Sequence, residues 1–477
     1  MRICLIAEGC YPYVAGGVSS WVQMLMQGMP EHTFVIYTIG AEEAQRGSFK
    51  YELPANVERV EENFLDEYLS VKVGKHRRFD LAPRERQALL DLITTNHPDW
   101  DVLFDMFARD GSYRANEFLT SEAFLDVVME ACEGTFRLAP FNDVFWTIRS
   151  MLLPVLNVLR CPVPDVDVFH SVSTGYAGLL GALFQSRTGK PFIVTEHGIY
   201  SREREEEILR AKWVDVYFKR TWIDFFQGLS ASVYRHADVI VSLFHHARDL
   251  QIEYGADPAR CRVIPNGVDL ARFSGIDELP LERDGLVLGA VVRVVAIKDL
   301  KTMISAFAQI RARREDAALY IIGPTDEDPD YYRECLDFID ALGVRGIEFV
   351  GRVDVAAWYG RLDMVLLSSI SEGQPFVLLE AMASGRPVVA TDVGSCRELV
   401  EGVGDGLGNA GAIVPVMSPG AMAQTVLSLA DDRRRLRQMG EIGRERVSRI
   451  YREEDFLSSY RDLYKEVNGR WRASGSN

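Results

Sequence analysis

Two glutamates eight positions apart, Glu372 and Glu380, have the type and spacing that best suit binding chemistry in this chain. Between them, Gly373 and Pro375 favour a turn, and the apolar residues that follow favour a helix. A helix that starts near Pro375 places Glu372 in the loop before it and Glu380 one turn in. Carboxylates accept hydrogen bonds from hydroxyls, and helix-start amides face phosphate. The spacing therefore indicates a ligand with hydroxyls at both ends and a phosphate between them.

Two cations five positions apart, Arg293 and Lys298, follow an expected strand at 286–292 and precede an expected helix. Arginine holds phosphate oxygens with its planar fork and lysine acts as a point charge, so the pair suits one diphosphate. The alternative is that each cation forms a surface ion pair with a nearby carboxylate, because isolated Arg and Lys are common on surfaces. Both interpretations stay open from these two residues alone.

A double glycine and a histidine also lie where ligands bind in parallel sheets. Gly16 and Gly17 follow the apolar run 2–7, and glycine lets the backbone approach a ligand closely. His197 follows an expected strand at 191–195, so it projects from the carboxyl end of that strand. The alternative for His197 is a buried structural residue. The glycine loop is no dinucleotide fingerprint, since Gly-x-Gly-x-x-Gly does not appear there.

The elements that must position these residues form two series of alternating strands and helices, which is typical of parallel α/β sheets. The longest helical stretch of the first series is expected from about 202 to 236, after the strand at 191–195. The expected strands of the first series are 2–7, 33–39, 166–170, 191–195 and 238–242, and those of the second are 286–292, 318–322, 347–350, 363–367, 387–391 and 411–414.

A chain of 477 residues is too long for one ordinary core, so we expect two Rossmann-like domains. Residues 1–275 form the first and 276–450 the second, with their strand ends facing a central cleft. Residues from about 41 to 165 lose the strand–helix rhythm and indicate a helical insertion in the first domain. The tail, 451–477, is expected to pack back on the first domain through its aromatics, Tyr451, Phe456, Tyr460 and Tyr464.

Composition excludes several classes of function. The net charge of -16 argues against a nucleic-acid partner, and the basic stretches 209–220 and 433–437 have the spacing of solvated helix faces. Seven cysteines without a Cys-x-x-Cys pair predict reduced thiols and no metal site. No signal peptide and no run of about 18 apolar residues is present, so the sequence predicts a cytoplasmic protein without a membrane span.

At these residues the chain resembles the family 4 glycosyltransferases, retaining enzymes of the GT-B fold. Glu372 and Glu380 match the Glu-x7-Glu motif of that family, and Arg293 and Lys298 match its Arg-x4-Lys pair. The early glycine loop and two further segments, Ile-Pro-Asn-Gly-Val-Asp at 264–269 and Ala-Ser-Gly-Arg-Pro-Val-Val-Ala at 383–390, also look like it. The resemblance covers about 166–450 and the first forty residues, but not the insertion.

The resemblance implies a UDP-sugar donor and a carbohydrate acceptor, without a cofactor or a metal ion. It places Glu380 on the ribose, Arg293 and Lys298 on the diphosphate, and Glu372 and His197 near the hexose. Arg293, Lys298, Glu372 and His197 are the expected catalytic residues. It also implies front-face attack, in which the departing phosphate takes the acceptor proton. The expected donor-binding residues are Gly16, Gly17, Arg293, Lys298, Glu372, Gly373, Gln374, Pro375, Phe376, Val377 and Glu380.

Two further segments, 7–21 and 195–200, look like the soluble transferase of Pel exopolysaccharide systems. That resemblance implies transfer of a hexose or N-acetylhexosamine to a growing polysaccharide, and docking to an inner-membrane polysaccharide synthesis complex. Three alternatives stay open: a sugar-nucleotide epimerase of the same fold, a phosphorylase, and a noncatalytic module that senses a sugar nucleotide.

Overall fold

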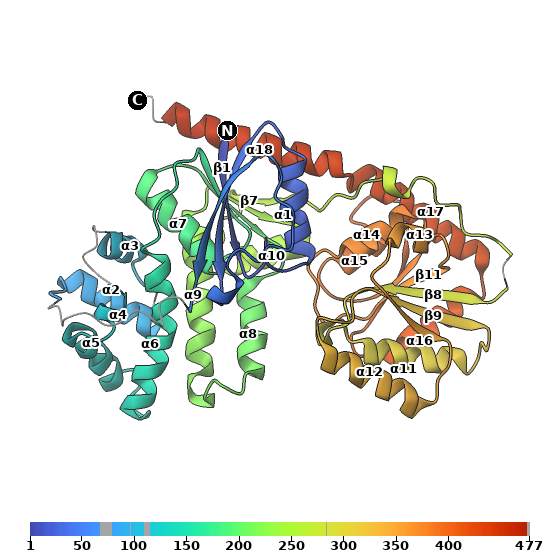
Figure 1. Cartoon of the computed structure of the whole chain (residues 1–477), viewed down its shortest axis with the longest axis horizontal. Coiled ribbons are helices and arrows are strands. Elements are labelled where there is room, and N and C mark those ends of the chain that lie inside the picture. The colour runs from blue at the N-terminus through green and yellow to red at the C-terminus, as the bar shows by residue number, and fades with distance from the viewer. Residues whose placement is uncertain (67–78, 96, 109–114, 283, 475–477) are drawn as a thin grey trace. The chain divides into compact units, whose positions relative to one another are not determined.

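The computed structural model describes residues 1–66, 79–95, 97–108, 115–282 and 284–474, which form two compact units (Figure 1). Unit 1 comprises residues 1–263 and 460–477, and unit 2 comprises residues 264–459. Each unit is built on one parallel sheet, so the prediction of two parallel-sheet α/β domains is confirmed.

Unit 1 has a seven-stranded sheet in the order β3-β2-β1-β4-β5-β6-β7. Its strands are β1 (Arg2–Glu8), β2 (Thr33–Gly40), β3 (Val57–Phe64), β4 (Val168–Ser171), β5 (Phe192–Glu196), β6 (Val239–Ser242) and β7 (Cys261–Val263). Its helices are α1 (Gly17–Gln27), α2 (Pro83–Thr94), α3 (Trp100–Ala108), α4 (Ala115–Phe118), α5 (Glu122–Glu133), α6 (Phe141–Val158), α7 (Tyr176–Thr188), α8 (Tyr200–Arg210), α9 (Lys219–His236) and α10 (His245–Glu253).

Unit 2 has a six-stranded sheet in the order β10-β9-β8-β11-β12-β13. Its strands are β8 (Leu286–Val291), β9 (Ala317–Ile322), β10 (Ile347–Gly351), β11 (Met364–Leu367), β12 (Val388–Thr391) and β13 (Gly411–Val414). Its helices are α11 (Leu300–Arg311), α12 (Pro329–Leu342), α13 (Val355–Tyr359), α14 (Phe376–Ala383), α15 (Cys396–Glu401), α16 (Pro419–Ala430) and α17 (Arg433–Ile450), and α18 (Glu453–Ser474) follows them.

The central strands of both sheets are buried, which explains why they read as short apolar runs. Ile3, Leu5 and Ile6 of β1 are fully buried, and so are Leu366 and Leu367 of β11. Helices cover both faces of a parallel sheet, so side chains on both sides of a central strand must be apolar. The sequence therefore located these strands to within a few residues.

The insertion begins later than expected, because β3 belongs to the sheet. Within the stretch 41–165, residues 57–64 pair in parallel with β2 at the sheet edge. Four of the eight residues of β3 are charged, and most are only half-buried. An edge strand packs less completely than a central one, so this strand lacks the apolar run by which the others were found. The helical part of the insertion runs from α2 to α6.

The expected helical stretch 202–236 is two helices, α8 and α9, and Figure 1 shows them as a hairpin. Lys219 donates its Nζ hydrogen bond to the Leu209 carbonyl, 2.6 Å away, at the end of α8. The Asp215 carboxylate then accepts from the Tyr217 amide at 2.8 Å and starts a short 3-10 turn. Val214 and Phe218 are buried within this connection. These local contacts interrupt the helix between Arg210 and Lys219, so the expected single helix is divided into two.

The boundary between the units lies before the expected position at 275, because the segment after β7 is bonded to unit 2. The Asn266 amide donates to Gln374 Oε1 at 2.5 Å, and Asn266 Nδ2 donates to the Gln374 carbonyl at 3.2 Å. The Val268 amide donates to the Tyr451 carbonyl at 2.9 Å. These contacts join residues more than one hundred positions apart. The local composition around 275 does not indicate them, so the sequence alone placed the boundary too late.

The tail divides between the units. Tyr451 lies in the core of unit 2, rather than against the first domain as expected. Helix α18 begins in unit 2, and its residues from Tyr460 onward belong to unit 1. There Tyr464 Oη lies 2.7 Å from His170 Nδ1, and Tyr460 Oη lies 3.1 Å from Thr195 Oγ1. Among the helices of the described residues, none is long and apolar enough to cross a membrane.

A buried arginine on α17 holds the last turn of α15 and the loop before β13. The side chain of Arg446 is fully buried, and its Nε lies 2.5 Å from Asp405 Oδ2. Its Nη1 donates to the carbonyls of Leu399 and Val400, at 3.0 and 2.8 Å. Removing one partner of such a buried pair leaves an uncompensated charge and several unsatisfied carbonyls.

We expect Arg446→Met to lower the free energy of unfolding of unit 2 by about 3–5 kcal/mol. Calorimetric or denaturant unfolding of the purified chain measures this. The control is Arg449→Met on the same helix, whose pair with Glu445 is exposed and contributes about 0.5 kcal/mol or less. Equal losses in the two variants would contradict the role of Arg446.

Candidate functional site

The segment 368–375 connects β11 to α14 at the carboxyl edge of the unit 2 sheet. Helix α14 starts at Phe376, with Pro375 as its N-cap, close to where the sequence predicted a helix. Pro375 contributes no side-chain cap, so no side chain occupies the first amides of α14 from that position. Phe376 and Val377 are half-buried, whereas Leu378 is fully buried. The carboxylates of Glu372 and Glu380 therefore stand before and within this helix.

The backbone of this segment rests on the loop after β12. Gly394 has φ +53°, and a Cβ added there would lie 2.1 Å from the Glu372 carbonyl oxygen and 2.3 Å from that of Gly373. The Ser395 amide donates to the Gly373 carbonyl at 2.9 Å. Thr391 Oγ1 donates to the Ser369 carbonyl at 2.7 Å. Only glycine permits this approach, so Gly394 fixes the position of Glu372.

Lys298 and Glu372 form a largely buried ion pair. Lys298 Nζ lies 2.5 Å from Glu372 Oε1, and the two side chains are 16% and 10% exposed. Ser369 Oγ donates to the same carboxylate oxygen at 2.5 Å. Ser368 Oγ donates to the Lys298 carbonyl at 2.8 Å, which ties the two loops together. The structure therefore brings together the lysine and the first glutamate that the sequence singled out.

Arg293 forms a more exposed ion pair with an acid on the neighbouring β9–α12 connection. Its Nη1 lies 2.8 Å from Glu327 Oε2, and the two side chains are 40% and 25% exposed. Both cations therefore form ion pairs, but only that of Arg293 is the surface pair weighed as the alternative from the sequence, because the pair of Lys298 is largely buried. A role for Arg293 and Lys298 on a diphosphate stays a prediction.

Glu380 lies within α14 and is held by a tyrosine. Tyr359 Oη donates to Glu380 Oε2 at 3.0 Å, and Tyr359 is fully buried. Burial raises the pKa of the Glu380 carboxyl, and the Tyr359 hydrogen bond opposes that rise. One carboxylate oxygen is thus oriented by the protein. Sequence reasoning missed Tyr359, because nothing in the segment 355–359 indicates a contact twenty-one residues away.

Gln374 is a structural bridge as well as a predicted binding residue. The Asn266 contacts described above use both its side-chain oxygen and its carbonyl. Asn266 belongs to the 264–269 segment that resembles the family. The sequence did not indicate that Asn266 contacts Gln374, and only the structure shows this pair.

The remaining predicted residues belong to unit 1. Gly16 is the N-cap of α1 with an extended φ of 174°, and Gly17 is the first helical residue. A Cβ added at either position would meet nothing within 4 Å. Neither strained dihedrals nor close packing requires glycine here, which leaves open space beside the start of α1. The predicted cleft shared by the two domains stays a prediction.

His197 lies beside the same helix. Its ring is 4.8 Å from that of Trp21 in an edge-to-face arrangement, and Trp21 is a fully buried residue of α1. Among the described residues, the buried Nε2 atom of His197 has no hydrogen-bond partner. Burial lowers the pKa of His197 to about 3, so the imidazole is neutral near pH 7. A neutral ring can exchange hydrogen bonds with a hydroxyl.

Behind His197 lies a buried polar network that the sequence did not indicate. His170 Nε2 lies 2.8 Å from Thr195 Oγ1, and its other nitrogen contacts Tyr464 of α18. Burial lowers the pKa of His170 to about 3. The adjacent Glu196 carboxylate accepts from Tyr234 Oη at 2.6 Å and from Gln251 Nε2 at 2.9 Å. These contacts fix the end of β5, from which His197 projects.

Within the parts of the chain that the structure describes, no group of three or more His, Cys, Asp or Glu side chains has the arrangement of a metal site. The cations and carboxylates of the site bond to protein groups instead, as Lys298 does to Glu372 and Arg293 to Glu327.

Two family descriptions match the chain. Residues 1–259 match "Domain of unknown function (DUF3492)", and residues 284–432 match "Glycosyl transferases group 1".

Curated proteins of related sequence are sugar transferases. The chain is 25% identical over 330 residues to MMP alpha-(1->4)-mannosyltransferase of Mycolicibacterium hassiacum, which covers 68% of this chain and 76% of that protein. It is 32% identical over 227 residues to D-inositol 3-phosphate glycosyltransferase 2 of Catenulispora acidiphila, covering 44% of this chain and 52% of that protein. The chain thus spans about half the length of the second relative.

Two solved structures share the fold over nearly the whole chain. Sucrose-phosphate synthase from Thermosynechococcus elongatus gives a TM-score of 0.63 at 16% identity, covering 98% of this chain and 99% of that one. Anabaena HepE in complex with UDP gives 0.61 at 15% identity, covering 98% and 100%. The expected GT-B architecture of two parallel-sheet domains is therefore confirmed.

We expect Gly394→Ala to lower the free energy of unfolding of unit 2 by about 1–3 kcal/mol, because the added Cβ displaces the Glu372 carbonyl. Denaturant unfolding of the purified chain measures the change. Gly404→Ala is the matched control, since Gly404 has φ +66° but nothing within 4 Å of an added Cβ. Equal losses of stability in the two variants would contradict a specific role for the 394 contact.

Acid should destabilise unit 1. His170 and His197 have pKa values lowered to about 3 from 6.5, so below pH 6.5 the unfolded chain binds protons that the folded chain does not. Their stabilising contribution is present above pH 6.5 and is lost toward pH 3, by about 1.4 kcal/mol per pH unit for each histidine. Denaturant unfolding at pH 7, 6 and 5 measures this.

The variant His197→Phe should remove about half of that histidine-dependent slope. His245→Phe, at an exposed position at the start of α10, is the control and should leave the slope unchanged. A stability that does not change between pH 7 and pH 5 would contradict the neutral buried state of both rings.

Proposed function

Since the chain belongs to the DUF3492 family and its second unit is a group 1 glycosyltransferase domain, we propose that it is a retaining, metal-independent hexosyltransferase. It moves a hexose or N-acetylhexosamine from a UDP-sugar to a growing polysaccharide. Pel-type exopolysaccharide biosynthesis by a PelF-like enzyme is the specific form of this proposal, and the segments 7–21 and 195–200 support it.

The observation that carries the proposal is the buried contact of Lys298 with Glu372 beside the start of α14. A diphosphate bound at that helix start is a stronger partner for Lys298 than one carboxylate, because it offers several charged oxygens. When the donor binds, Lys298 exchanges its ion pair with Glu372 for contacts with the diphosphate. The Glu372 carboxylate then accepts hydrogen bonds from the hydroxyls of the sugar. The ion pair holds both side chains in place until the donor binds.

The other donor contacts follow from the same edge of the sheet. Glu380, oriented by Tyr359, accepts hydrogen bonds from the ribose hydroxyls. Arg293 turns from its exposed pair with Glu327 to the diphosphate. The amides at the start of α14 complete the anion site. Together these groups stabilise the leaving UDP, which is where negative charge develops in the transition state.

In unit 1, the open space beside Gly16 and Gly17 lets donor or acceptor approach the start of α1. The neutral His197 ring, which projects from the end of β5 beside α1, lies near the hexose in this proposal. The acceptor hydroxyl attacks the anomeric carbon on the face that UDP leaves, and the departing phosphate takes its proton. No carboxylate nucleophile is required on this route, in contrast to a retaining glycosidase.

The comparisons support the donor and substrate classes. HepE is solved in complex with UDP and with UDP-glucose, and the curated relatives transfer sugars. A cytoplasmic location with docking to an inner-membrane synthesis complex, through the helical part of the insertion, completes the proposal.

One assay distinguishes this proposal from two alternative functions, an epimerase and a sensing module. It follows UDP release and donor consumption with and without a carbohydrate acceptor. A transferase consumes the UDP-sugar in an acceptor-dependent way. An epimerase converts it without an acceptor, and a sensing module binds it without turnover. Acceptor-independent conversion or binding without turnover would overturn the proposal.

We expect Lys298→Ala and Arg293→Ala each to lower kcat about 100-fold or more, the size of effect seen when one transition-state charge partner is removed. UDP release under saturating donor measures this. Lys301→Ala is the control, because Lys301 on the first turn of α11 forms an exposed pair with Glu334 and should keep normal turnover. Wild-type turnover in the Lys298 variant would contradict its role.

A further inference from the structure

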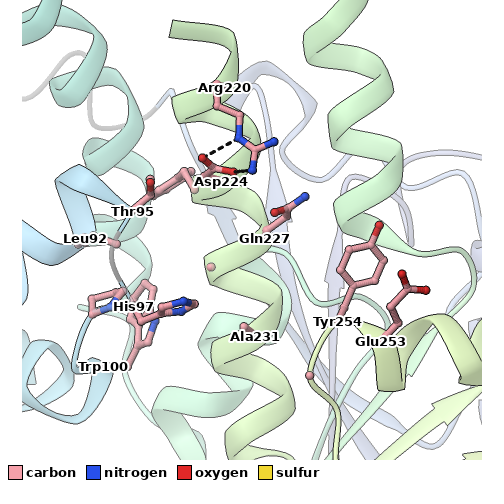
Figure 2. Close-up of a pocket in the computed structure, with 14 residues that line it drawn as sticks. Leu92, Thr95, His97, Trp100, Arg220, Asp224, Gln227, Ala231, Glu253 and Tyr254 are labelled. Atoms are coloured by element: carbon pink, nitrogen blue, oxygen red, sulfur yellow. Dashed lines mark hydrogen bonds and ion pairs between the residues drawn. The ribbon is translucent and has the colours of Figure 1, made fainter. Parts of the chain in front are cut away.

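A cavity lies in unit 1, and no residue assigned above to sugar transfer lines it. It has a volume of about 540 Å³ and lies between the α2–α3 connection, one face of α9 and the end of α10 (Figure 2). Gly16, Gly17 and His197 do not line it. Its size falls within the range of small-molecule sites.

The floor of the cavity is one face of α9. Asp224, Gln227, Gly228 and Ala231 line it, at spacings of three, four and seven residues from the first. A Cβ added at Gly228 would meet nothing within 4 Å. Glycine inside a helix lowers helix stability, and no packing contact here requires it. The small residues in the middle of α9 keep this space open.

The walls combine aromatic and polar side chains. Figure 2 shows Trp100 and His97 on one side of α9 and Tyr254 on the other. Arg220 and Asp224 form a paired fork, with Nε to Oδ2 at 2.9 Å and Nη2 to Oδ1 at 2.7 Å, so their charges offset each other.

Gln227 extends from the floor on the side of Tyr254 (Figure 2). Its amide is one of the polar groups that line the cavity. An amide offers two donors and one acceptor, which is suited to hydroxyl groups rather than to an ion.

We propose that this cavity binds a neutral sugar unit of the acceptor or product chain. The half-buried Tyr254 ring offers an apolar face to the C–H face of a pyranose, while Gln227, Glu253 and the Arg220–Asp224 pair bond its hydroxyls. A phosphate or nucleotide is disfavoured, because the one arginine is already paired with Asp224 and the acid Glu253 lies in the same lining.

This inference rests on the proposed function, since it assigns the cavity to the carbohydrate that the enzyme extends. A chain held at the cavity and at the transfer site gains affinity from the second contact without any new interaction at the first. Affinity for the acceptor therefore rises with its length.

The test is ligand-observed NMR and calorimetric titration of the full chain with oligomers of glucose, galactose, N-acetylglucosamine and N-acetylgalactosamine, one to six units long. Gly228→Leu fills the cavity, and we expect it to weaken oligomer binding at least tenfold. Gly469→Leu is the matched control, because Gly469 is also inside a helix with nothing within 4 Å of an added Cβ. It should bind oligomers as the wild type does.

Thermal melting shows whether either variant is unfolded, and neither should melt below the wild type, because leucine replaces glycine in a helix. Binding that is equal in Gly228→Leu and the wild type would overturn the proposal, as would a wild type that binds none of the oligomers. A Gly228→Leu protein that melts early is replaced by Gln227→Ala, which should also weaken binding.

The donor assay with UDP-sugar is run on the same wild-type sample. Normal turnover with no oligomer binding overturns the cavity assignment alone. Oligomer binding that Gly228→Leu removes, in a protein without turnover, overturns the transferase proposal alone.

Discussion

The close approach of Gly394 to the carbonyls of Glu372 and Gly373 is the constraint on which the candidate donor site depends. Because no side chain fits there, the loop after β12 supports the loop after β11. The supported loop holds Glu372 within reach of Lys298, which lies on the connection after β8. Three neighbouring strands of the sheet, β8, β11 and β12, therefore combine their carboxyl ends into one arrangement.

The sequence predicted the central architecture because burial determines it. Strands covered on both faces must be apolar, and parallel strands bring the residues that follow them to one edge. Arg293, Lys298, Glu372 and His197 could be placed at strand ends for that reason alone. The edge strand β3 was not predicted, because its partial burial allows charged residues in the strand. The break between α8 and α9 was not predicted either, because hydrogen bonds of the Lys219 and Asp215 side chains determine where it lies.

The parts of the site that could not be predicted are contacts between residues remote in sequence. Tyr359 orients Glu380, and Asn266 bonds Gln374 across more than one hundred residues. Gly394 carries no local sign that its neighbour is the Glu372 carbonyl. Residue type and spacing identify which groups have the chemistry. The folded chain decides which of their atoms are already bonded, and so which bonds a ligand must replace.

Helix α18 has a consequence for the order in which the protein is made. The strands of unit 1 leave the ribosome long before Tyr460 and Tyr464 are synthesised, yet these two hydroxyls contact the buried Thr195 and His170. Until α18 is made, His170 and Thr195 lack the tyrosine hydroxyls that they contact in the folded chain. The first unit is thus completed by a helix that follows most of unit 2 in sequence. A chain terminated before α18 lacks these contacts behind His197, even though every residue of the sheet is present.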